Sequence, residues 1–224
     1  MSTLLLRLAA PLQSWGTDSK FETRRTQREP SKSGVIGLLA AALGWRRDAD
    51  LSKLTALRFG VRVDRNGELL KDFHTAKSRK TSYITHRYYL SDAIFLVGLE
   101  SEDEDFLYEL KAALERPCFP LFLGKRSCPP TLPLVLEICS KDLETALREK
   151  ENLNTNQKSI RNSKRYLRID CRSSERGSAV LQDLPISFSP LKRQFGFRTA
   201  REVWLKEDMG DGIDKEHDPM AELD

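Results

Sequence analysis

From residue 2 to residue 139, strand-like and helix-like apolar segments follow one another in an order that few folds accommodate. The spacing of apolar residues predicts strands at 2–9, 59–64, 92–99 and 134–139, and helices at 34–43 and 103–114. The order strand, helix, strand, strand, helix, strand is typical of the ferredoxin-like or RRM-like fold. The sequence therefore predicts an α+β protein built on such a core.

Local signals mark the ends of some of these elements. Ser33 is expected to cap the N-terminus of the helix at 34–43. Asn66-Gly67 is a strong hairpin signal, so a partner strand should run over about 68–73. Residues 75–87 are polar and basic, and they fall between the two middle strands. A β-hairpin, or thumb, is expected to protrude there.

Beyond about residue 141 the periodic pattern weakens. Short strands are expected at 165–171 and 178–181, and the basic segment 191–205 ends in a strand-like run. These observations predict three parts. They are an RRM-like domain at 1–140 with its thumb at about 75–87, a small β-rich C-terminal domain at 141–205, and an acidic tail at 206–224 that is expected to be mobile.

The net charge of +4 hides an asymmetry between the body and the tail. Residues 206–224 contain eight acids and two bases, a charge of −6, so residues 1–205 carry the difference, +10. Clustered Lys and Arg produce a long-range field that attracts phosphates. The charge pattern favours a polyanionic partner such as a nucleic acid.

The four cysteines form no CxxC pair, and none has a histidine at the spacing of a zinc site. Reduced thiols, no metal and no cofactor are therefore expected. The longest uncharged apolar run, 34–45, is shorter than the roughly 18 to 20 residues of a membrane span. Because no secretory signal is recognisable either, we expect a cytoplasmic protein without a membrane partner.

A basic loop directly precedes the helix at 34–43. Residues 20–32 carry five bases against two acids. A helix N-terminus presents free N–H groups and the positive end of its dipole, and Gly34 permits close approach of a ligand. We therefore expect Arg24, Arg25, Lys32 and the start of this helix to hold a phosphate backbone.

Three further groups of residues allow both a functional and an ordinary structural interpretation. Gly124-Lys125-Arg126-Ser127 is not a Walker A motif, since the required earlier glycine is missing. It indicates a turn whose two bases could hold a phosphate. Gln194-Phe195-Gly196-Phe197 resembles part of an RNA-binding strand, although packing is the expected role of its phenylalanines. A nuclease would use His74 or His86 as general acid or base, with Tyr83 or Lys80 nearby.

Five segments occur in the order typical of one family. They are LLLRLAAPLQSWG, RRTQREPSKSGVIGLLAAALG, HRYYLSDAIFLVGL, PLFLGKRSCPP and RQFGFRTAREVW. In these segments the chain resembles the CasD-type subunits of type I-E CRISPR Cascade, in the RAMP superfamily. The segments are distributed over nearly the whole chain.

The resemblance implies a noncatalytic subunit that grips the 5′ handle of the CRISPR RNA and caps the backbone filament in antiviral defence. It implies as partners the crRNA, the CasC-type backbone subunit, the CasA-type large subunit and target DNA within the assembled complex. Relatives in type I-C systems cut repeat RNA without a metal, using Tyr, Lys and His, and Tyr83, Lys80 and His86 could take those roles. Cleavage is therefore the alternative function.

Together with the basic segments, the resemblance gives one set of expected RNA-binding residues. They are Trp15, Arg24, Arg25, Lys32, Ser33, Gly34, Lys77, Arg79, Lys80, Tyr83, His86, Arg87, Lys125, Arg126, Ser127, Arg193, Gln194 and Arg198.

Overall fold

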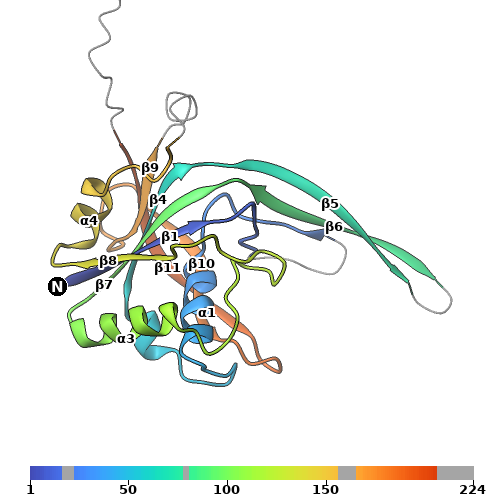
Figure 1. Ribbon diagram of the computed structural model, residues 1–224, viewed down its shortest axis with the longest axis horizontal. Coiled ribbons are helices and arrows are strands. Elements are labelled where there is room, and N and C mark those ends of the chain that lie inside the picture. Colours follow the sequence, from blue (N-terminus) through green and yellow to red (C-terminus); the bar gives the residue numbers. More distant parts are fainter. Residues whose placement is uncertain (17–22, 78–80, 156–164, 206–224) are drawn as a thin grey trace, which may run out of the picture.

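The computed structural model describes residues 1–16, 23–77, 81–155 and 165–205. Their strands form two sheets (Figure 1). One sheet has seven strands in the order β10-β11-β9-β4-β7-β1-β8, and the other joins β2, β3, β5 and β6. The chain is thus a mixed α+β protein with mostly antiparallel strands, which confirms the predicted class.

The elements have the following bounds. The first sheet contains β1 (Ser2–Ala9), β4 (Arg58–Arg65), β7 (Ile94–Ser101), β8 (Val135–Cys139), β9 (Tyr166–Asp170), β10 (Ser178–Ser187) and β11 (Gln194–Trp204). The second contains β2 (Leu12–Gln13), β3 (Thr23–Arg24), β5 (Glu68–Lys77) and β6 (Ser82–Ser91). The helices are α1 (Lys32–Ala42), α2 (Ser52–Thr55), α3 (Glu104–Glu115) and α4 (Leu143–Glu149).

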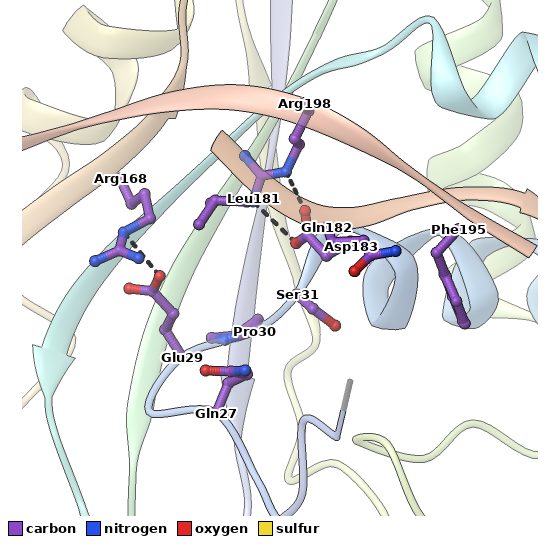
Figure 2. Close-up of a pocket in the computed structure, with 10 residues that line it drawn as sticks. All are labelled: Gln27, Glu29, Pro30, Ser31, Arg168, Leu181, Gln182, Asp183, Phe195 and Arg198. Atoms are coloured by element: carbon purple, nitrogen blue, oxygen red, sulfur yellow. Dashed lines mark hydrogen bonds and ion pairs between the residues drawn. The ribbon is translucent and has the colours of Figure 1, made fainter. Parts of the chain in front are cut away.

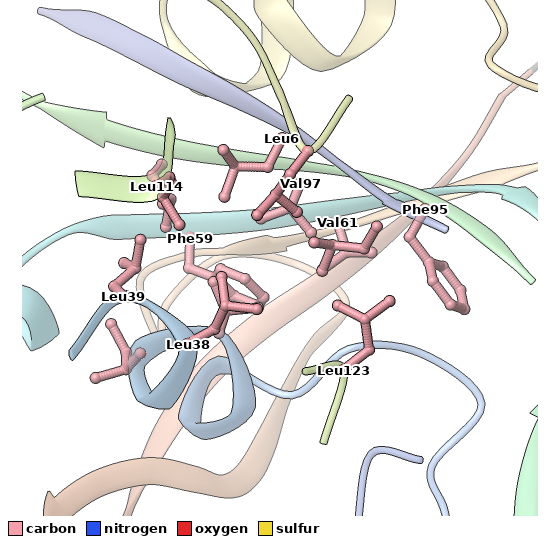
Figure 3. Close-up of a cluster of buried hydrophobic side chains, with 14 of the residues drawn as sticks. Leu6, Leu38, Leu39, Phe59, Val61, Phe95, Val97, Leu114 and Leu123 are labelled. Carbon is pink, nitrogen blue, oxygen red and sulfur yellow. The ribbon is translucent and has the colours of Figure 1, made fainter. Parts of the chain in front are cut away.

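The seven-stranded sheet is apolar on both faces, because successive side chains of a strand point to opposite sides. Leu6, Phe59 and Val97 belong to the main core, which α1 and α3 cover (Figure 3). Leu5 and Leu96 belong to a smaller core under α4, on the other face. The four strands predicted first are all present, and β4, β7, β1 and β8 are antiparallel neighbours in that order.

Helix α4 was not predicted, because its seven residues are too few to show a helical period. Its place on the sheet depends on two glycines that face each other on β4 and β7. A Cβ on Gly60 would lie 2.8 Å from Leu147 Cδ1, and one on Gly98 would lie 2.5 Å from Leu143 Cδ1. These glycines let the helix pack directly on the strand backbones.

The prediction that Ser33 caps the first helix is wrong. Helix α1 begins earlier, and the Ser31 hydroxyl caps it by accepting a hydrogen bond from the Gly34 N–H at 3.2 Å. Both serines can cap a helix, and no local pattern favours the earlier one. Lys32, Ser33 and Gly34 consequently form the first turn of the helix.

The prediction that 59–64 and 68–73 pair as a hairpin is also wrong. Gly67 does adopt the left-handed φ of +68° that a turn residue needs. The turn, however, passes the chain from one sheet to the other, so that β4 pairs with β7 and β9 while β5 pairs with β6. The protruding hairpin therefore begins at Glu68 instead of near residue 75, and it extends far from the body as a long arm (Figure 1).

The C-terminal strands continue the seven-stranded sheet. β9 pairs with β4, with Ile169 opposite Gly60, and β11 and β10 follow outward. The segment is β-rich as predicted, but the sheet does not break at residue 140. The division into domains at that point stays a prediction, and the tail at 206–224 lies outside the described residues.

Two further observations concern the described residues. None of their helices is long and apolar enough to cross a membrane. All four cysteines carry free thiols.

Candidate nucleic-acid interface

Three cations converge at the base of the hairpin arm. β3 lies parallel to β6 and places Arg24 beside Arg87. Lys125 reaches the same strand from a neighbouring turn, with its Nζ 4.1 Å from the centre of the Tyr89 ring. Arg87 and Tyr89 are two residues apart on β6 and therefore point to the same face of the hairpin. We call Arg24, Arg87 and Lys125 the cationic cluster.

The charge of this cluster is balanced only in part by carboxylates within the described part of the chain. None of its three members forms an ion pair there, and Asp72, opposite Arg87, is paired with His74 at 2.7 Å. Burial lowers the pKa of Lys125, and the charges of Arg87 and Arg24 lower it further, although Cys128 and Asp72 partly oppose this effect. Nε of Arg87 is buried without a hydrogen-bond partner. An anion at this place would relieve the mutual repulsion of the cations.

The turn that carries Lys125 is fixed by a glycine. Gly124 has a φ of +85°, and a Cβ on it would lie 1.7 Å from the Ser14 carbonyl oxygen. The turn closes with a hydrogen bond from the Cys128 N–H to the Lys125 carbonyl at 2.9 Å. Arg126 and Ser127 are exposed at its tip. The predicted basic turn is confirmed, although its contact with a phosphate stays a prediction.

The prediction that the start of α1 binds a phosphate is wrong, because a carboxylate of the chain already occupies it. The Lys32 N–H donates to Asp183 Oδ2 at 2.8 Å. The Lys32 ammonium is buried, 2.8 Å from Asp170 Oδ2, and donates to the Leu57 carbonyl. Ser33 is buried as well. Lys32, Ser33 and Gly34 therefore stabilise the fold and offer no open anion site.

Trp15 and Arg198 also prove to be structural. Trp15 is 1% exposed, its ring lies over Gly34, and its Nε1 donates to Gln13 Oε1 at 3.1 Å. Arg198 binds Asp183 and Asp170, each at 2.6 Å. Burial lowers the pKa of Arg198, but the hydrogen bonds and charges of the two aspartates outweigh it and raise that pKa. Neither side chain is open to RNA.

The two faces of the hairpin arm carry different side chains. Tyr83 is 57% exposed and lies on the same face as Arg87, further from the body. Lys77 is exposed on the other face, with Phe73, Ile84 and His86. Arg79 and Lys80 lie outside the described residues. The arm thus extends the face of the cationic cluster with an aromatic ring.

Of the nuclease candidates that the structure describes, His86 lies on the opposite face of the hairpin from Tyr83 and His74. Tyr83 and His86 are three positions apart on β6, so their side chains point to opposite sides of the hairpin. Nδ1 of His86 is buried and makes no hydrogen bond within the described structure. Acid and base groups that act on one phosphate must reach it together, and this pair does not.

Three other expected residues are open to solvent. Arg25 is exposed in the basic loop, and Arg193 and Gln194 are exposed at the start of β11. The Arg193 guanidinium lies 5.0 Å from the centre of the Phe195 ring. Packing is the expectation for both phenylalanines of this motif, but Phe197 is 65% exposed.

A polar pocket lies between the end of the basic loop and the strands β10 and β11 (Figure 2). Its volume is about 240 Å³. Arg168 enters it on one side and pairs with Glu29 at 2.9 Å, while Arg198 and Asp183 form a second pair. Burial raises the pKa of Glu29, although the charge of Arg168 and a hydrogen bond from Tyr166 oppose this effect. The sequence did not predict this pocket, since the residues that line it are up to 171 positions apart in the chain.

The fold and the cationic cluster define a class of protein, an α+β body with a long hairpin arm that is basic at its root. A model of the family described as CRISPR-associated protein (Cas_Cas5) matches residues 3–201. The chain belongs to this Cas5 family.

The relatives agree with this assignment. The chain is 39% identical over 173 residues to the CRISPR system Cascade subunit CasD of Escherichia coli strain K12, over 65% of this chain and 75% of that protein. A chain of a solved CRISPR RNA-guided surveillance complex is 33% identical, with a TM-score of 0.74 over 90% of this chain and 89% of that one. A crystal structure of a Cas protein is 41% identical, with a TM-score of 0.69 over 92% and 95% of the two chains. The resemblance to CasD-type subunits is thereby confirmed.

Proposed function

We propose that this protein is a noncatalytic RNA-binding subunit of a type I-E CRISPR Cascade surveillance complex. It grips the 5′ handle of the crRNA and caps one end of the backbone filament in antiviral defence. The observation that carries this proposal is the convergence of Arg24, Arg87 and Lys125 at the root of the arm, where none of the three forms an ion pair in the described structure. The 39% sequence identity to the Cascade subunit CasD supports the proposal that the protein is part of such a complex.

The cationic cluster suits a single-stranded backbone. Proteins hold single-stranded RNA by combining basic side chains for the phosphates with aromatic rings for the bases. Arg24, Arg87 and Lys125 supply the first kind of contact, Arg25 and Arg126 can extend it, and Tyr83 supplies a ring further along the same face. The RNA would thus lie across the root of the arm and continue toward its tip.

We further propose that the core beside this interface has the RRM-like or ferredoxin-like fold. The strand order β4-β7-β1-β8, with α1 after β1 and α3 after β7, supports that assignment. The arm β5–β6 is the thumb, and residues 141–205 form the small C-terminal domain. The protein works in the cytoplasm with a CasC-type backbone subunit, a CasA-type large subunit and target DNA within the complex.

Metal-independent cleavage of repeat RNA is the alternative function. Tyr83 and His86 on opposite faces of β6 count against it. We expect the purified protein to leave a CRISPR repeat RNA intact, with or without a chelator, in a denaturing gel assay. Site-specific cutting that His86→Ala or Tyr83→Phe abolishes would establish the alternative instead.

The affinity for single-stranded RNA tests the proposal directly. For single strands, log K falls with log salt by about 0.7 for each phosphate neutralised. The triple variant Arg24→Ala/Arg87→Ala/Lys125→Ala should bind a ten-nucleotide RNA more weakly and reduce this slope by about 2. Lys53→Ala, which removes an exposed lysine of α2, is the matched control and should change neither quantity. An unchanged slope in the triple variant would contradict the proposed interface.

A further inference from the structure

The pocket beside the basic loop is suited to an uncharged ligand. Its two cations are already neutralised, Arg168 by Glu29 and by Glu202 at 2.6 Å, and Arg198 by two aspartates. A phosphate would meet the carboxylates of Glu29 and Asp183 and gain no free positive charge. The pocket and the cationic cluster therefore differ in the chemistry that they can bind.

The walls of the pocket are suited to a flat ring with polar edges. Phe195 and Leu181 enter from β11 and β10, and Pro30 enters from the loop on the opposite side (Figure 2). Gln182 also lines the pocket, is exposed, and makes no hydrogen bond within the described residues. An amide offers both donors and an acceptor, so it can pair with the edge of any nucleobase.

An irregularity in β10 produces this arrangement. The pairing of β10 with β11 shifts between Leu181 and Leu184, which leaves Gln182 and Asp183 outside the regular ladder. Asp183 can then reach the start of α1, while Gln182 lies at the pocket. Such β-bulges are frequent next to functional sites, where they redirect a side chain.

The pocket also lies where a bound backbone would pass. The loop that supplies Gln27, Glu29 and Pro30 to its wall carries Arg25 and Arg28, both exposed and without an ion pair among the described residues. The same loop contributes Arg24 to the cationic cluster. Phosphates held along the loop would bring their bases to the mouth of the pocket.

We infer that this pocket receives one unpaired nucleobase of the bound RNA, stacked on Phe195 and hydrogen-bonded at its edge by Gln182. This inference rests on the proposed RNA-binding function and adds a base site to the backbone site. Stacking on an aromatic ring accommodates every base, and it strengthens binding by roughly 1–3 kcal/mol per base. The base would therefore contribute roughly a 5- to 150-fold gain in affinity.

The test compares two ligands of equal charge, decauridylate RNA and a ribose-phosphate decamer of the same length without bases. Fluorescence anisotropy gives the affinity ratio of the two ligands for each variant. The ratio should fall at least about fivefold in Phe195→Ala, as expected from loss of one stacked base. In the control Phe197→Ala, the exposed phenylalanine two residues further along β11, it should not change.

One further variant, with its affinity ratio and its melting temperature, makes each outcome decisive. Phe195→Leu keeps the apolar volume without the ring, so it should lower the ratio while leaving the melting temperature nearly unchanged. Equal ratios in wild type, Phe195→Leu and Phe197→Ala would overturn the base pocket and leave the cationic interface intact. If the wild-type protein binds neither decamer, the proposed RNA-binding function itself fails, and with it this inference.

Discussion

Lys32 shows how the surroundings of one residue decide whether a basic side chain is available to a ligand. Its ammonium, with Asp170, Arg198 and Asp183, forms a buried network that ties the start of α1 to the three C-terminal strands. Charges removed from water must be paired with others, so these cations cannot also bind phosphate. Arg24 and Arg87 have no such partners in the described structure, and this is why we assign RNA binding to them.

Replacing Lys32 should therefore destabilise the fold without affecting RNA binding. Removal of one partner from a buried ion pair costs about 3–5 kcal/mol, so Lys32→Ala should lower the free energy of unfolding by about that amount in urea denaturation. The folded fraction should bind RNA as wild type does. The exposed Lys53→Ala should cost less than about 1 kcal/mol. A stable Lys32→Ala protein with weakened RNA binding would restore the phosphate role that we reject.

Glu29 gives a prediction about pH. Burial raises the pKa of its carboxyl above the ordinary value of 4.5. The folded state then holds the proton to a higher pH than the unfolded state, so the contribution of Glu29 to stability is lost as pH rises from about 4.5. The melting temperature of Glu29→Gln relative to that of wild type should therefore increase as the pH is raised above about 4.5. Glu202→Gln, which removes the more exposed partner of Arg168, is the control; the same trend in both variants would contradict this assignment.

The helices, strands and turns that could be predicted from the sequence are those that local chemistry determines. The four core strands, α3 and the turn at Gly124 follow from apolar spacing, caps and glycine positions. Pairing between distant segments could not be read in the same way. The Asn66-Gly67 pair predicts a turn from local sequence alone. The strand that pairs with β5 is β6, and the turn residues do not indicate that partner. The carboxylate at the start of α1 comes from Asp183, 151 residues away, and no local pattern indicates it.

The outer part of the hairpin arm, 76–85, should be dispensable for folding and necessary for assembly. Its outer residues are exposed and contribute little to the core, and a hairpin that buries so little cannot offset its ordering entropy when alone. Replacing 76–85 with a short Gly-Ser linker should shift the melting temperature by less than about 2 °C. It should also abolish co-purification with the backbone subunit and guide RNA. Normal assembly without the arm would place the grip on the RNA elsewhere.

Two groups of basic residues have different roles in the molecule. Those under the C-terminal strands hold the body together, and those at the root of the arm remain open for a polyanion. Between them, the pocket at the end of the basic loop is neutral and partly aromatic. Such a distribution suits a protein that holds one RNA strand at a fixed place.

The proposed function requires the protein to hold one defined RNA end as part of a larger assembly. Its most direct test is affinity purification of the full chain from cells that express it with its Cascade partners, followed by sequencing of the bound RNA. We expect short RNAs with a single uniform 5′ end, together with the backbone and large subunits. The Arg24→Ala/Arg87→Ala/Lys125→Ala variant should lose both. RNA with scattered 5′ ends, or the same yield of defined RNA with the triple variant, would contradict the account.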